Sequence, residues 1–159
     1  SRYQLRHVDG KFVCVNERGE RGLNRDAQGS VLSSKSAICT DLRGSQFEGA
    51  SLAGAELSGS DLSGADLGRA NLVDASFFAA KLRETDLAGA NLVAAQFTGG
   101  SDLTGAHLQT ANLKGLRPLL EPVHALTAIP DDVDTRIAMA KANWNGLPID
   151  NFLPASQTV

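Results

Sequence analysis

Leucine or phenylalanine returns at every fifth position through the middle of this 159-residue chain. Five is the period of neither an α-helix nor a β-strand, so this segment must be built from a repeating unit of its own. The series runs for twelve repeats, slips by one residue, and continues for three more. Its members are Leu42, Phe47, Leu52, Leu57, Leu62, Leu67, Leu72, Phe77, Leu82, Leu87, Leu92, Phe97, Leu103, Leu108 and Leu113.

A second series lies two places before these residues and contains only small side chains. Residues two apart in an extended chain point to the same side, while the polar residue between them faces outward. The remaining two places are rich in glycine, which suits a bend. Repeated bends would wind the chain into a coil with both series inside. The small series is Ser45, Ala50, Ala55, Ser60, Ala65, Ala70, Ala75, Ala80, Thr85, Ala90, Ala95, Ser101, Ala106 and Ala111.

The segments "AGAELSGSDLSGADLGRANL" and "TDLAGANLVAAQF" carry a family resemblance. They resemble pentapeptide-repeat proteins, whose motif is approximately A(D/N)Lxx. The resemblance implies a right-handed quadrilateral β-helix, an all-β solenoid with four pentads in each coil of 20 residues. It covers about residues 38–116, which would make about four coils. The family serves several unrelated purposes, so the resemblance constrains the fold more than the function.

Positions 20 apart are then expected to stack at the strand spacing of about 4.8 Å, which gives four faces. The slip near Gly99 falls at the corner from face four to face one, where an extra residue can bulge outward without disturbing the stack. The inward columns are Leu42, Leu62, Leu82 and Leu103 on face one; Phe47, Leu67, Leu87 and Leu108 on face two; Leu52, Leu72, Leu92 and Leu113 on face three; and Leu57, Phe77 and Phe97 on face four.

Three apolar side chains stand at outward positions that other pentads fill with polar residues. Val73 and Val93 point outward from face three, and Phe78 projects from face four. We take these three residues as a candidate partner-binding patch, which either binds another chain or is covered by this chain's own tail. The asparagines beside the valines are expected to form a stabilising ladder of amides: Asn71, Asn91 and Asn112.

The N-terminal segment "YQLRHVDGKFVCVN" predicts a β-hairpin, because two alternating runs are joined by Asp9–Gly10. That turn sets Leu5 opposite Cys14. One face of the hairpin is expected to sit on the first coil, with His7 as a hydrogen-bonded core histidine. We expect residues 16–37 to form a loop, with a short strand around Val31 and Leu32 as an open alternative. The inward face would hold Tyr3, Leu5, His7, Phe12 and Cys14.

Cys14 and Cys39 are the two cysteines of the chain. A disulfide between them would tie the hairpin to the start of the coil, with a typical gain of about 2–4 kcal/mol. It would also place the protein in an oxidising compartment, as an exported periplasmic or lumenal protein. Two separate buried thiols would instead suit a cytoplasmic protein. The sequence leaves both alternatives open.

The C-terminal segment predicts a helix at about residues 131–144, because Pro130 suits the first turn and Asn145–Gly146 suits the end. This helix would cap the last coil, or it would join two chains, since some members of the family are similar to a two-fold rod joined at C-terminal ends. Monomer and homodimer therefore both stay open. The apolar stripe of the helix is Val133, Ile137, Ala140 and Trp144.

We therefore expect one folded unit with three parts. Residues 1–37 would form a cap of hairpin and loop, residues 38–116 the β-helix, and residues 117–159 a tail with the capping helix. A convex four-sided prism offers no concave, partly desolvated setting for catalysis.

Catalytic, metal and cofactor motifs are not found in the sequence. The three histidines and two cysteines show no HxH, HExxH or CxxC spacing for a metal, and there is no GxSxG elbow or phosphate loop. We expect no enzyme activity, no catalytic residue, no metal and no cofactor.

The net charge of −3 and the sequence pI of about 5.5 argue against direct nucleic-acid binding. No apolar stretch approaches the roughly 18 residues of a membrane-spanning helix, so we expect no membrane insertion. The leading hypothesis is a non-catalytic structural or protein-binding module that presents side-chain columns to an unidentified protein partner.

The alternative comes from the resemblance, because some pentapeptide-repeat proteins mimic DNA and bind a type II topoisomerase such as gyrase. Residues 41–115 hold nine acidic and five basic residues, so bases interrupt the acidic columns. That interruption weakens the alternative.

Overall fold

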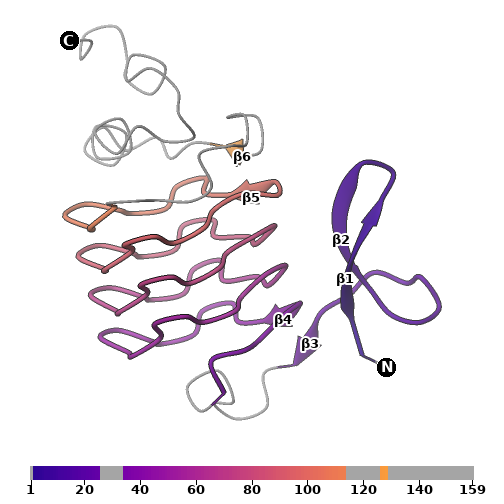
Figure 1. Cartoon of the computed structure of the whole chain (residues 1–159), viewed down its shortest axis with the longest axis horizontal. Coiled ribbons are helices and arrows are strands. Elements are labelled where there is room, and N and C mark those ends of the chain that lie inside the picture. Colours follow the sequence, from indigo (N-terminus) through magenta and orange to yellow (C-terminus); the bar gives the residue numbers. More distant parts are fainter. Residues whose placement is uncertain (1, 26–33, 114–125, 129–159) are drawn as a thin grey trace, which may run out of the picture.

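The computed structural model describes residues 2–25, 34–113 and 126–128. The repeats wind into a stack of coils, and a hairpin lies along one side of the stack (Figure 1). Most pentads contribute a single β-bridge rather than a longer strand. The strands are β1 (Gln4–Val8), β2 (Lys11–Val15), β3 (Asn24–Arg25), β4 (Thr40–Asp41), β5 (Ser101–Asp102) and β6 (Leu126–Ala128).

Successive coils are joined by parallel bridges between residues 20 apart, as in Asp41 with Asp61 and Asp61 with Lys81. The backbone hydrogen bonds keep the same register, since the Leu42 N–H donates to the Asp61 carbonyl at 2.8 Å. Past the slip the spacing becomes 21, as in Lys81 with Asp102. The predicted stacking and the predicted position of the slip are both confirmed.

The leucine and phenylalanine series forms the core. Leu52, Leu72 and Leu92 are fully buried on face three. Within face four the rings of Phe77 and Phe97 stack with centroids 4.8 Å apart and planes 7° from parallel. The small series lies beside them, and most of its members are also buried. The five-residue period therefore predicted the core directly.

The corners from Leu42 to Leu108 use a left-handed backbone conformation at the second residue after each leucine or phenylalanine. Gly54 has a φ of 74°, and the Ala55 N–H closes the turn by donating to the Leu52 carbonyl at 3.0 Å. Glycine suits such a corner because it has no Cβ. The coil also forces other residues into this conformation: Arg69, Asp74, Ala79, Glu84, Ala94 and Thr110.

Face one is continued in both directions by strands that the sequence analysis did not predict. β3 pairs in parallel with β4, which places Arg25 beside Asp41. β6 pairs in parallel with β5, which places Leu126 beside Ser101. The expectation of loop at Asn24–Arg25 was therefore wrong, because two residues are too few to leave a periodic signal. The alternative strand around Val31 and Leu32 lies outside the described residues.

The hairpin has the predicted antiparallel register, with Leu5 opposite Cys14 and His7 opposite Phe12. It lies beside the coils rather than over the first of them, and the ring of Phe12 contacts Phe78 at a centroid distance of 4.6 Å (Figure 1). The prediction of a core histidine was wrong. His7 is exposed and stacks on Phe12, because the flank of the coil covers only part of the hairpin.

The predicted C-terminal helix, with Val133, Ile137, Ala140 and Trp144, lies outside the described residues. Across residues 2–25, 34–113 and 126–128, no helix has the length and apolar character needed to cross a membrane.

Candidate functional site at the junction of hairpin and coil

A disulfide joins Cys14 of β2 to Cys39, with the two Cα atoms 5.7 Å apart. Cys39 occupies the left-handed corner just before β4, with a φ of 51°. Of the two alternatives that the sequence left open, the structure therefore shows the bonded pair. The bond fixes the hairpin to the start of the coil across 25 positions of the sequence.

Gly59 lies against this disulfide, in the corner one coil after Cys39. A Cβ at Gly59 would stand 2.9 Å from Cys14 Sγ, 3.0 Å from Cys39 Sγ and 3.0 Å from Leu5 Cδ1. The Gly59 carbonyl oxygen lies 3.2 Å from Cys14 Sγ. This approach is a close contact and not a hydrogen bond, because a bonded sulfur carries no proton. The missing side chain at Gly59 is thus what lets the hairpin approach the coil.

Phe78 lies over Gly99, where a Cβ would come within 2.6 Å of the phenylalanine ring. Phe12 of the hairpin meets the same ring edge-on, with 74° between the planes. Phe12 nevertheless remains 40% exposed, so the hairpin covers this flank only in part. Phe78 is therefore engaged by the N-terminal hairpin of its own chain.

Val73 and Val93 lie on face three, away from that contact. Both are half-buried, and they stand one coil apart in the same column. The backbone N–H of Val73 donates to Asn71 Oδ1 at 3.2 Å, and Val93 makes the same bond to Asn91. The structure thus separates the three candidate patch residues into a valine pair on face three and a phenylalanine under the hairpin.

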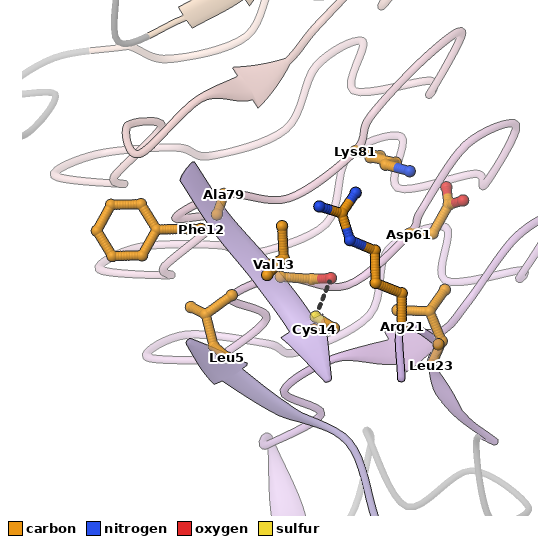
Figure 2. A pocket seen from close by; sticks show the side chains of 11 residues that line it. Leu5, Phe12, Val13, Cys14, Arg21, Leu23, Asp61, Ala79 and Lys81 are labelled. Atoms are coloured by element: carbon orange, nitrogen blue, oxygen red, sulfur yellow. Dashed lines mark hydrogen bonds between the residues drawn. The ribbon is translucent and has the colours of Figure 1, made fainter. Parts of the chain in front are cut away.

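The hairpin and the coil together enclose a groove of about 330 Å³ (Figure 2). One part of its lining is apolar and includes Cys14. The other part is charged: Arg21 extends from the hairpin side toward Asp61 and Lys81, which project from neighbouring coils (Figure 2). Within the described part of the chain, Arg21 and Lys81 form no ion pair. The apolar lining is Leu5, Phe12, Val13, Leu23 and Ala79.

The groove could not be predicted from the sequence, because no local pattern indicates on which flank of the coil a hairpin will lie. The two cysteines were the available signal. Once they are taken as bonded, Cys14 must lie beside the corner column that contains Cys39 and Gly59, and the groove follows from that position.

Arginines pair with acids elsewhere on the coil. Arg43 contacts Asp41 at 2.8 Å on face one, and the hydrogen bond from Arg43 holds the pKa of Asp41 below its usual value. Arg69 pairs with Glu48 at face two. Arg43 and Arg69 therefore neutralise part of the acidic charge of the coil.

A metal centre is not indicated in the described ranges. There, no three side chains of histidine, cysteine, aspartate or glutamate gather closely enough to hold an ion.

Comparison with known proteins gives a family and a fold. The family model for pentapeptide repeats matches residues 40–69 and 70–115, with eight copies. Among the curated proteins, a search finds no match to this chain. A solved pentapeptide repeat protein, Rfr23 from the cyanobacterium Cyanothece 51142, is 34% identical with a TM-score of 0.50. The match covers 52% of this chain, which spans about half (55%) of the length of that protein.

Two further solved structures are similar over different lengths. A pentapeptide repeat protein from the Arabidopsis thaliana thylakoid lumen is 26% identical, with a TM-score of 0.40 and coverage of 76% of this chain and 84% of that one. QnrB1, a plasmid-mediated fluoroquinolone resistance protein, is 20% identical, with a TM-score of 0.27 and coverage of 58% and 53%. With its repeats at residues 40–69 and 70–115, the chain belongs to the pentapeptide-repeat family, whose members form right-handed quadrilateral β-helices.

Proposed function

We propose that this protein is a non-catalytic protein-binding module that works in an oxidising compartment as an exported protein. Pentapeptide-repeat proteins are generally non-catalytic structural modules. The Cys14–Cys39 disulfide supports the oxidising compartment, because such bonds are rare where thiols are kept reduced.

The uncharged outward column of face three is the observation that carries the binding role. This column consists of Ser51, Asn71, Asn91 and Asn112, all exposed, and the valines of the candidate patch stand beside it. Faces one and two instead carry aspartates at the corresponding positions, such as Asp61 and Asp66. A strip of serine and asparagine side chains beside valines offers hydrogen bonds and apolar area together, which suits a protein partner whose identity is open.

The test of this role is the double variant Val73→Ser with Val93→Ser. The immobilised protein is used to capture partners from exported fractions of its source cells, and captured proteins are quantified by mass spectrometry. We expect the double variant to lose its specific partner while its melting temperature stays at the value of the parent. Ala88→Ser is the matched control, because Ala88 is half-buried at the same pentad position on face two.

Two results would contradict a partner-binding role for Val73 and Val93 on face three. Unchanged capture by the double variant would place the partner elsewhere on the molecule. A clear fall in melting temperature would show that the valines are covered by the chain itself. Phe78→Ser is kept as a separate variant, because it removes the ring that Phe12 contacts.

Binding of a type II topoisomerase by DNA mimicry is the alternative. That role calls for a long acidic surface, and pairs such as Arg43 with Asp41 and Arg69 with Glu48 reduce it here. Light scattering at micromolar concentration together with a gyrase inhibition assay separates the two roles. A molar mass near 16.7 kDa without inhibition removes the mimic, whereas inhibition by a dimer joined at the C-terminal ends would replace our proposal.

A further inference from the structure

The two cysteines of the disulfide differ in their exposure to solvent. Cys39 is fully buried, whereas Cys14 is half-buried and lines the groove between hairpin and coil (Figure 2). We propose that this groove binds a small anionic thiol of the glutathione class, which exchanges into the disulfide at Cys14. Thiol–disulfide exchange at Cys14 Sγ then releases the hairpin from the coil.

The charges at the groove match this class of ligand. Glutathione carries two carboxylates, one ammonium group and one thiol. The groove offers two cations, Arg21 and Lys81, and one anion, Asp61, around an apolar part that contains the sulfur. Neither cation has an ion-pair partner within the described residues, so both remain available to carboxylates. The volume of about 330 Å³ is at the lower end of the range for small-molecule pockets.

The exchange step is balanced. The thiolate of glutathione attacks Cys14 Sγ, a new S–S bond forms there, and the Cys14–Cys39 bond breaks. The electron pair leaves with Cys39 Sγ, which takes up a proton and becomes a thiol. The product has a glutathionyl group on Cys14. A second glutathione thiolate can attack the sulfur of that glutathionyl group, which releases glutathione disulfide and leaves Cys14 as a thiolate that takes up a proton.

Little else holds the hairpin once the disulfide is open. No residue of β1 or β2 is fully buried. The remaining contacts include Phe12 on Phe78, Leu5 near Gly59 and the hydrogen bonds between Asn24 and Tyr3. The hairpin is also joined to the segment before β3 by the Gly22 N–H, which donates to the Cys14 carbonyl at 3.2 Å. A two-stranded hairpin is only marginally stable alone, so exchange at Cys14 is expected to uncover the flank beneath it.

The experiment treats the oxidised full chain with reduced glutathione near pH 8, where a useful fraction of the thiol is ionised. Samples are quenched by rapid alkylation, and intact mass and peptide mapping locate the adduct. We expect one glutathionyl group on Cys14. Peptide mapping that finds the group on Cys39, or no exchange at all, would overturn the proposal.

The role of the cations is tested by comparing glutathione with 2-mercaptoethanol, a neutral thiol. Arg21→Gln with Lys81→Gln should slow the glutathione reaction by about two- to fivefold for each cation removed, and leave the 2-mercaptoethanol rate near that of the parent. Because general loosening of the hairpin speeds both reagents, the ratio of the two rates isolates the charge effect. Arg43→Gln is the matched control, since this exposed arginine of face one does not line the groove. Equal ratios in all variants would show that no anionic thiol is recognised.

Discussion

The coil and the hairpin are both β-structure, but they are stabilised in different ways. In the coil, Leu72 is fully buried and its N–H donates to Asn91 of the next coil. The same arrangement recurs along the stack, so burial and hydrogen bonding are distributed over many equivalent places. The hairpin has no fully buried strand residue, and it is attached by one covalent bond, the contact of Phe12 with Phe78 and a few hydrogen bonds. The stability of the coil is therefore spread over many equivalent contacts, whereas attachment of the hairpin depends on a few.

The largest effect is expected from a cavity in the coil. Leu72→Ala removes a fully buried side chain in the middle of face three and should cost about 2–5 kcal/mol of unfolding free energy. Urea denaturation with the disulfide intact measures this cost. If Leu72→Ala lost less unfolding free energy than Cys14→Ser with Cys39→Ser, the coil would not be the more strongly stabilised of the two regions.

Loss of the disulfide should come second and should act locally. Cys14→Ser with Cys39→Ser is expected to cost about 2–4 kcal/mol, because the bond closes a loop of 25 positions. Hydrogen exchange should show lost protection in β1 and β2 while the amides of Leu62 and Leu82 keep theirs. Uniform loss of protection across both regions would mean that hairpin and coil unfold as one unit.

A pair of glycines at equivalent corners separates backbone strain from contact with the hairpin. Gly54 and Gly59 have φ values of 74° and 71°, but only Gly59 has atoms within 4 Å of an added Cβ. Each Gly→Ala change should cost about 1–2 kcal/mol for the left-handed conformation, and Gly59→Ala should cost more because it pushes against both sulfurs. Equal melting temperatures would show that the hairpin can move away without loss.

The smallest effect concerns pH. Partial burial acts to raise the pKa of Asp102, but hydrogen bonds from Thr104 and Arg83 outweigh it, and the pKa lies below its usual value. A carboxyl with a lowered folded pKa stabilises the fold above its unfolded pKa, near 3.9, and loses this contribution as pH falls through the folded pKa. Asp102→Asn should therefore cost about 0.2–1 kcal/mol at neutral pH.

This pH effect is checked by thermal denaturation of both proteins from pH 7 downward. The difference between Asp102→Asn and the parent should shrink below about pH 4. A difference that is constant with pH would assign the effect to packing instead of charge.

The core and the register of the coil could be predicted from the sequence, because the five-residue period determines which side chains point inward and which residues stack. Once Leu62 is inward, Leu82 must stack on it, and the bridges between successive coils confirm that register. The hairpin register was equally predictable, because Asp9–Gly10 fixes which residues pair. These are local rules that act within a few residues.

Placement of the hairpin could not be predicted, because it depends on contacts between distant residues. Phe78 meets Phe12 across 66 positions, and Gly59 makes room for a sulfur that comes from β2. The strands β3 and β6 were missed for a related reason. Each has two or three residues, too few for a pattern, and pairing with a coil that is already formed specifies them.

These two strands have a consequence for assembly of the protein into filaments. A β-helix is a stack of strands, and an open end of the stack is a template on which another copy can add in register. On face one, β3 and β6 occupy the template positions next to β4 and β5. Each adds one further rung of two or three residues, contributed by the chain itself, at a position where a second copy could otherwise pair. A second copy therefore cannot add directly to β4 or β5 on this face while β3 and β6 are in place.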